Sequence, residues 1–283
     1  MQTPHIIPAG KACGAEVQGV DLAALGPVTT AALQQAVHGH LAVVVRGQPI
    51  SDPQLLALGQ VFGTLEVQGV SVLGQQYADA HPDHLVASNR MMLGRPTGSL
   101  GGGEAIWQTD LSYRMRPCSI AILHALDVPP VAGNTWFANQ YLAYETLPAD
   151  LKTRLDNKTL IHDESHDSTG QLRKGYAEVT DPREAPGAQH PIFRTHPQTG
   201  RKALYLGRRR NAYMVGLPLE DSEQLLDQLW AHATRPEFVW GHEWRVGDTL
   251  IWDNRCVIYR HDGFDAEGGR EMHRVQIRGE IPR

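Results

Sequence analysis

The sequence predicts a mainly β protein with a barrel or jelly-roll core and helices packed outside it. Short strand-like segments crowd the middle and the C-terminal part of the chain, and helical segments lie near the N-terminus and between strands. Strands and helices do not alternate regularly, so a closed antiparallel core is favoured over a parallel sheet. No linker divides the 283 residues, and we therefore expect a single domain over residues 1–283.

The N-terminal part predicts two helices around one buried strand. Apolar residues at helical spacing predict a helix over 29–39, which begins at a threonine cap. The β-branched run at 41–45 is typical of a buried strand. Ser51 or Asp52 then caps a second helix, which ends at Gly63.

The rest of the chain predicts the strands of the core. Residues 118–126 form an apolar strand run, and 146–160 have the pattern of an amphipathic helix. Residues 190–207 predict a hairpin with a turn at PQTG, and 221–234 predict another amphipathic helix. Several closely spaced short strands follow up to the C-terminus, which completes the pattern of a barrel.

Two segments hold no strong period and predict loops. Residues 69–103 are weakly patterned and rich in glycine, and they precede a candidate active-site motif. Residues 163–189 are polar and interrupt the strand pattern. We expect both segments to be lid or insertion loops.

Bulk composition excludes several classes of protein. The formal net charge of -5 is small for 283 residues, so nothing predicts a nucleic-acid partner. No run approaches the ~20 apolar residues of a membrane helix, and the N-terminus lacks a signal-peptide pattern. Cys13, Cys118 and Cys256 lie too far apart for a disulfide framework, which predicts buried free cysteines in a cytoplasmic protein.

Three segments together carry the functional information: AIWQTDLSY at 105–113, VAGNTWFAN at 131–139, and the long stretch from GDTLIWDN to VQIRGE at 247–280. With supporting matches at 43–63 and 190–207, their order and spacing resemble the taurine dioxygenase/phenoxyacetate dioxygenase (TauD/TfdA) family. The resemblance implies a double-stranded β-helix, a jelly-roll and cupin-like core. It also implies Fe(II) and 2-oxoglutarate, or a similar carboxylate, as cofactors.

The metal-binding pattern of that family is altered in this chain. The family binds iron through a His-x-Asp pair and a distal histidine, the facial triad of iron oxygenases. Here the pair reads Gln108-Thr109-Asp110, and the distal position is Tyr259. The resemblance thus makes Asp110 the retained metal ligand, while Gln108 and Tyr259 stand where two imidazoles are expected.

The residues that hold the cosubstrate are retained. The resemblance implies that Arg270 grips the far carboxylate of 2-oxoglutarate, because its planar fork binds a carboxylate through two hydrogen bonds. Thr135 matches the residue that hydrogen-bonds the same carboxylate, and Arg274 is a second arginine typical of the family. Trp252 matches the strand that carries the distal ligand, and we place it with these cofactor-binding residues.

Three functions remain open on these residues. An oxygenase with an atypical metal site would use oxygen donors, which prefer harder ions than imidazoles do; His261 is its candidate rescue ligand. A metal-independent isomerase, lyase or cyclase would use Asp110 and Tyr259 as base and acid. A non-catalytic relative would bind a ligand in the same pocket.

The substrate is expected to be a small organic molecule, with anionic character one option. Asn89, Tyr113 and Arg208 are the candidate substrate residues. Arg208 opens a run of three arginines that can steer an anion or form a solvated basic turn. The resemblance also suggests a homo-oligomer, and we expect neither nucleic acid nor a membrane as partner.

Overall fold

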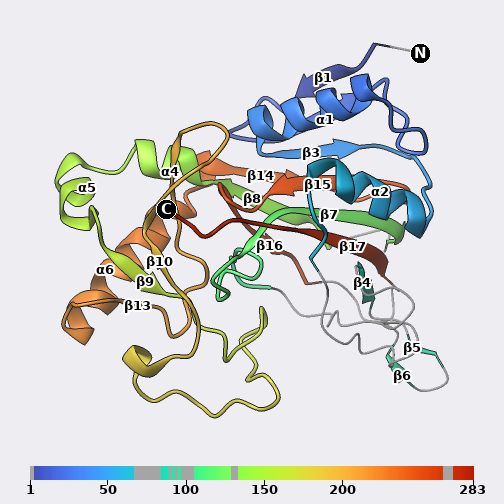
Figure 1. Ribbon diagram of the computed structural model, residues 1–283. Coiled ribbons are helices and arrows are strands. Elements are labelled where there is room, and N and C mark those ends of the chain that lie inside the picture. Colours follow the sequence, from blue (N-terminus) through green and yellow to red (C-terminus); the bar gives the residue numbers. More distant parts are fainter. Residues whose placement is uncertain are drawn as a thin grey trace.

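A seven-stranded sheet forms the larger wall of the computed structural model (Figure 1), in the order β1-β2-β3-β15-β7-β17-β4. All its pairings are antiparallel except that of β2 with β3. The strands are β1 (His5–Pro8), β2 (Ala15–Gln18), β3 (Ala42–Val45), β15 (Thr249–Asp253), β7 (Cys118–Asp127), β17 (Glu271–Arg278) and β4 (His84–Ser88). The structure describes residues 3–66, 84–88, 91–92, 95–96, 105–128, 133–263 and 270–283.

A three-stranded antiparallel sheet faces the larger one and completes a jelly-roll core. Its order is β14-β8-β16, with β14 (Val239–His242), β8 (Thr135–Asn139) and β16 (Val257–His261). Side chains of both sheets share one apolar cluster, in which Leu250 of β15 meets Phe137 of β8 and Val257 of β16. The predicted mainly β jelly-roll core is therefore confirmed.

Alternation along the strands of the larger sheet decides which residues enter the barrel. On β15, Leu250 and Trp252 belong to the inner cluster, whereas Ile251 packs with the helices outside. On β17, Val275 and Ile277 also pack outside. Because successive side chains of a strand point to opposite faces, the neighbouring positions of β17 face the interior of the barrel.

Helices α1 (Pro27–His40) and α2 (Asp52–Phe62) cover the outer face of the seven-stranded sheet (Figure 1). The second begins at Ser51 with a capping box to Gln54, as the sequence predicts. The threonine cap predicted for the first is wrong: Gly26 is the N-cap, and Pro27 provides the preset φ of a first helical turn.

The remaining elements are further helices and small sheets. They are α4 (Gln140–Glu145), α5 (Ala149–Leu155), α6 (Leu219–Ala233), the 3₁₀ turns η1 (Pro182–Glu184) and η2 (Pro236–Phe238), β9 (Thr159–Ile161), β10 (Gln189–Pro191), β13 (Tyr213–Met214), β11 (Phe193–Thr195), β12 (Lys202–Leu204), β5 (Met91–Met92) and β6 (Arg95–Pro96). The β5–β6 pair lies near β4 (Figure 1). Strands β11 and β12 pair as the predicted hairpin. The helix predicted over 146–160 is too long, because Asn157 adopts φ 61° and ends it before β9.

The structure describes the two predicted loop segments to different extents. Most of the segment 69–103 lies outside the described residues. The segment 163–189 is described and carries η1, and its role as a lid or insertion stays a prediction.

All three cysteines are buried and free, as expected. Within the described ranges, no helix combines the length and the apolar character needed to cross a bilayer.

Candidate functional site

Main-chain pairing brings the substituted metal positions together. The backbone N–H of Gln108 donates to the oxygen of Tyr259 at 2.9 Å, and the N–H of Tyr259 donates back at 2.8 Å. Gln108 therefore adds a bridge to the free edge of β16, and Asp110 follows it two residues later. The sequence prediction that Gln108, Asp110 and Tyr259 converge agrees with this geometry.

The three side chains are joined by direct hydrogen bonds. Gln108 Nε2 donates to the Tyr259 hydroxyl at 3.2 Å, and this hydroxyl donates to Asp110 Oδ1 at 2.8 Å. All three residues are buried. The Tyr259 hydroxyl thus acts as both acceptor and donor, and it occupies the space between the amide and the carboxylate.

Two residues of β17 approach the same carboxylate from the opposite sheet. Gln276 Nε2 donates to Asp110 Oδ2 at 2.7 Å, and Arg274 Nη1 lies 3.6 Å from Asp110 Oδ1. A carboxylate has about four lone-pair sites, so Asp110 keeps acceptor capacity beside these contacts. Asp110 is therefore a positioned carboxylate that can still accept a further hydrogen bond.

The phenol of Tyr259 stays neutral in this environment. Its ring centroid lies 5.2 Å from that of Trp252 and 6.2 Å from that of Phe137. Burial, and then the nearby Asp110 carboxylate, raise the pKa of the Tyr259 hydroxyl well above its usual value. Trp252 itself is fully buried beside Tyr259, so it positions the phenol, and its direct contact with a cofactor stays a prediction.

These residues do not fit the ferrous iron that the family implies. Two imidazoles are replaced by an amide and a neutral phenol, both weak ligands for Fe(II). The phenol and the carboxylate also hydrogen-bond each other, so a metal would have to break that contact. The proposed rescue ligand His261 turns its Nδ1 to the backbone oxygen of Asp262, at 3.0 Å. We therefore assign no step of the reaction to iron.

The predicted carboxylate grip is assembled around a tryptophan. Trp244 Nε1 donates to Thr135 Oγ1 at 2.9 Å, and the Arg270 guanidinium lies 5.9 Å from the centroid of the Trp244 ring. Burial lowers the pKa of Arg270 to about 10, so the guanidinium is still charged at neutral pH. Thr135 and Arg270 thus meet on the same indole, although Trp244 has no place in the family pattern read from the sequence.

Arg270 and Arg274 contact different parts of the site. Arg270 lies just before β17, and Met272 of β17 packs in the same apolar cluster as Trp244. The register shift between Glu271 and Met272 skips Leu126, so the extra residue lies on β7. The two arginines accordingly have separate roles, one at the Trp244 indole and one at the Asp110 carboxylate.

Of the three candidate substrate residues, the structure describes the surroundings of Arg208 and Tyr113. Arg208 is buried and donates from Nη2 to Gln108 Oε1 at 2.9 Å, so it belongs to the site. Its two neighbours pair with surface carboxylates instead. Tyr113 is buried and carries the Arg173 guanidinium 4.4 Å above its ring. Asn89 lies outside the described residues, and its substrate role stays a prediction.

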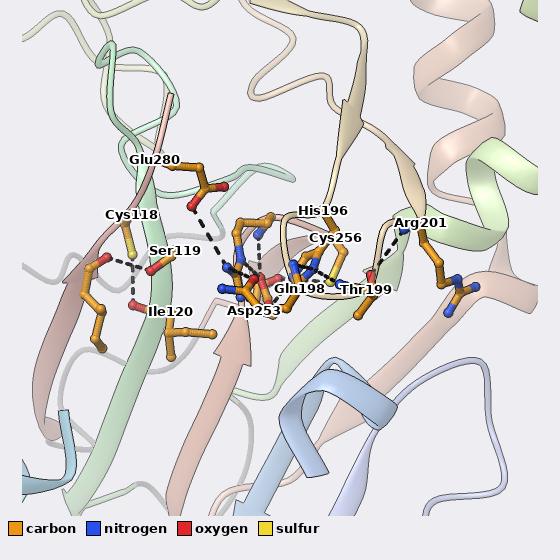
Figure 2. Close-up of polar contacts among 12 residues, drawn as sticks. Cys118, Ser119, Ile120, His196, Gln198, Thr199, Arg201, Asp253, Cys256 and Glu280 are labelled. Atoms are coloured by element: carbon orange, nitrogen blue, oxygen red, sulfur yellow. Dashed lines mark hydrogen bonds and ion pairs between the residues drawn. The ribbon is translucent and has the colours of Figure 1, made fainter. Parts of the chain in front are cut away.

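A second buried cluster lies at the turn that leads into β16. His196, Asp253 and Cys256 place their ligand atoms within 4.8 Å of one another (Figure 2). However, Arg255 donates to both carboxylate oxygens of Asp253, at 2.8 and 2.6 Å, and His196 Nε2 lies 2.9 Å from one of them. Burial raises the pKa of the Cys256 thiol well above its usual value. The cluster is thus an ion-pair network that fixes the turn before Tyr259.

This network predicts a pH dependence of stability. Burial alone would raise the pKa of Asp253, but the Arg255 guanidinium and His196 outweigh it and hold the pKa well below its usual value. A carboxyl group with a depressed native pKa stabilises the fold at neutral pH, and this contribution is lost as the pH falls below about 4. We expect urea unfolding of Asp253→Asn to show a smaller loss of unfolding free energy between pH 5 and 3 than the wild type. An equal loss in both proteins would contradict this assignment.

The fold and the site define a jelly-roll protein in which arginines surround a buried, hydrogen-bonded carboxylate and phenol. The family model "Taurine catabolism dioxygenase TauD, TfdA family" matches residues 5–276. The alpha-ketoglutarate-dependent 2,4-dichlorophenoxyacetate dioxygenase of Cupriavidus pinatubonensis is 31% identical over 270 residues, 92% of this chain and 93% of that protein. The chain therefore belongs to the TauD/TfdA family of 2-oxoglutarate-dependent dioxygenases.

Solved structures agree with this assignment. A taurine dioxygenase from Burkholderia xenovorans has a TM-score of 0.80 at 29% identity, and the match covers 99% of this chain and 91% of that one. AAD-2 in complex with Mn(II) and N-oxalylglycine has a TM-score of 0.81 at 28% identity, with 99% and 98% covered. The family resemblance of the sequence is confirmed.

Proposed function

We propose that this chain is a metal-independent member of its family that binds a small organic acid and transfers a proton on it. The observation that carries the proposal is the Tyr259 hydroxyl, which hydrogen-bonds both Gln108 and Asp110 at the metal position. A carboxylate and a phenol at 2.8 Å are a suitable general base and general acid.

The acid would be held by the residues that the family uses for 2-oxoglutarate. Arg270 supplies a buried positive charge, and Thr135 supplies a hydroxyl next to it. Charge-assisted hydrogen bonds to a carboxylate are stronger than neutral ones, so this end of the ligand provides binding and orientation. The reacting carbon would then lie toward Asp110.

The chemistry that follows needs no oxidant. For an acid with a carbonyl group, Asp110 takes a proton from the carbon next to the carbonyl. The C–H electron pair forms the new C=C bond, and the C=O π pair moves onto the carbonyl oxygen. The neutral Tyr259 phenol turns from Asp110 and donates its hydrogen bond to the resulting enolate oxygen. Return of a proton to the same carbon restores the carbonyl and gives exchange, or inversion where that carbon is a stereocentre, so atoms and electrons balance.

A direct test follows the C3 protons of 2-oxoglutarate in D₂O by proton NMR, with chelator present. We expect the wild type to catalyse exchange, and Asp110→Asn and Tyr259→Phe to lower the rate by about 100-fold or more. Arg209→Gln is the matched control, because Arg209 pairs with Glu223 and Asp227 at the surface. Unchanged exchange in Asp110→Asn would refute the acid–base roles.

A second candidate function is the oxidative reaction of the family with an oxygen-donor metal site. The retained Asp110 and the Thr135–Trp244–Arg270 arrangement favour it. Oxygen uptake with Fe(II) and 2-oxoglutarate, absent without Fe(II), would support this candidate over the metal-independent one. Binding of 2-oxoglutarate with neither exchange nor oxygen uptake would identify a non-catalytic ligand-binding relative.

A further inference from the structure

Arg208 is a buried cation held by neutral groups. Its Nη1 donates to the backbone oxygen of His166 at 2.5 Å, and its Nη2 donates to Gln108 Oε1 at 2.9 Å. These bonds use two of the five N–H groups of a guanidinium, and the buried Nε has no hydrogen-bond partner in the described part of the chain. Among those residues, no carboxylate forms an ion pair with Arg208. The Asp110 carboxylate acts on the Arg208 charge, but without an ion-pair contact. A buried charge that lacks a direct ion-pair partner is costly, which favours an anion beside it.

The neighbouring arginines show that this arrangement is particular to Arg208. Arg209 Nη2 lies 2.7 Å from Glu223 and 2.8 Å from Asp227, and Arg210 lies 3.6 Å from Glu178. Both side chains are partly exposed, so the basic turn predicted from the sequence describes them well. Arg208 alone of the three turns into the protein, and the same loop therefore carries two solvated cations and one buried cation.

The backbone around Arg208 fixes its position. Gly207, just before it, has φ +68°, and a Cβ there would lie 2.0 Å from His162 Nδ1. The oxygen of Gly207 accepts a hydrogen bond from the N–H of Thr109 at 3.0 Å. Only a glycine fits this turn, and the turn ties Arg208 to the strand segment that carries Gln108.

Sheet pairing places Arg208 at one end of the candidate site. Gln108 bridges Tyr259 on one side and Arg208 on the other, and Tyr259 pairs with Phe137 of β8. Paired residues of neighbouring strands project to the same side, at spacings of about 4.8 Å, so Arg208 lies about 10 Å across the sheet from Tyr259. Thr135 lies two residues along β8 from Phe137, so it is on the same face of the sheet as this row but beside it.

A second cation strengthens the positive charge around Arg208. Burial and then the nearby Arg173 lower the pKa of the Arg208 guanidinium. Arg173 itself packs over the ring of Tyr113, and its backbone N–H donates to the oxygen of Ser165 at 2.8 Å. The segment 163–189 thus contributes both a carbonyl that holds Arg208 and a cation close to it.

We infer that Arg208 anchors a second anionic group, so that the pocket's ligand carries one anion at each end, as a dicarboxylic acid does. One carboxylate is held by Arg270 and Thr135, and the other becomes the direct ion-pair partner that Arg208 lacks among the described residues. This inference rests on the proposed function, because it needs the ligand to lie along the inner face of the barrel. It names the substrate class that the acid–base pair would act on.

The test compares two probes by isothermal titration calorimetry with chelator present. Glutarate has two carboxylates, and pentanoate has a methyl group in place of one of them. We expect the wild type to prefer glutarate, and Arg208→Gln to weaken glutarate binding by about 10- to 100-fold with little effect on pentanoate. Arg209→Gln is the matched control and should keep the preference. Equal binding of both probes by the wild type, or an unchanged preference in Arg208→Gln, would overturn the inference.

A conservative variant guards against misfolding, because Arg208 is buried. Arg208→Lys keeps the charge and loses the planar fork, so glutarate binding should fall between that of the wild type and that of Arg208→Gln. Full wild-type glutarate affinity in Arg208→Lys overturns the inference if Arg208→Gln does not fold. An Arg208-dependent preference for glutarate without isotope exchange on 2-oxoglutarate would leave this inference standing and refute the proposed proton transfer, so the two fail separately.

Discussion

The double variant Gln108→His/Tyr259→His is expected to bind Fe(II) at least about 100-fold more tightly than the wild-type chain. Loss of outer contacts to metal ligands alone costs 10- to 100-fold in affinity, and here two direct imidazole ligands would be restored. The backbone already brings both positions together through paired hydrogen bonds of 2.9 and 2.8 Å. Asp110 would then complete a two-histidine, one-carboxylate set.

The measurement is anaerobic equilibrium dialysis with Fe(II), followed by the charge-transfer absorbance that appears when 2-oxoglutarate chelates bound iron. Each single variant should gain less than the double variant. Asp110→Ala in the double-variant background should lose the gain, because the carboxylate is the third ligand. Tight iron binding by the unaltered chain would contradict our conclusion that Gln108, Asp110 and Tyr259 do not fit ferrous iron.

Arg255→Ala is expected to lower the free energy of unfolding by about 3–5 kcal/mol, which is the usual cost of removing one partner of a buried ion pair. Both Asp253 oxygens now accept from Arg255, so the variant would leave Asp253 buried with the hydrogen bond to His196 as its remaining side-chain ion-pair contact in the described part of the chain. Arg255 also donates to Gln198 Oε1 at 2.6 Å. The turn between β15 and β16 would thereby lose the contacts that hold it against the β11–β12 hairpin.

Urea denaturation followed by circular dichroism at pH 7 measures this effect. Arg201→Ala is the control, because Arg201 is half exposed and pairs with the exposed Glu145 at 2.6 Å. We expect the control to change stability by about 1 kcal/mol or less. A loss in Arg255→Ala no larger than that of the control would show that the Asp253 network does not support the turn.

The convergence of Gln108, Asp110 and Tyr259 could be predicted, because the order and spacing of the motifs resemble a family whose metal ligands lie together at these positions. Two residues that contact the site, Gln276 and Trp244, were not predicted from the sequence. Gln276 shares a strand face with Arg274, and this spacing alone could have suggested it. Trp244 lies in a loop with no period, so its contact with Thr135 depends on how that loop packs.

The arginine run shows where sequence patterns stop being informative. Arg208, Arg209 and Arg210 are identical in type and adjacent in the chain, and a turn imposes no regular alternation on them. Their different surroundings arise because Gly207 turns the backbone next to His162 and directs only the first of them inward.

The residues by themselves determined the jelly-roll core and the family, because periodicity, order and residue type are written along the chain. They also predicted that Gln108 and Tyr259 stand where the family has two imidazoles. Tertiary structure decided what lies at this predicted position: a neutral phenol that hydrogen-bonds Asp110. It also decided that Arg208 is a buried cation facing the same site. Hydrogen-bond partners, burial and charge balance depend on contacts between distant segments, and these exist only once the two sheets close around the site.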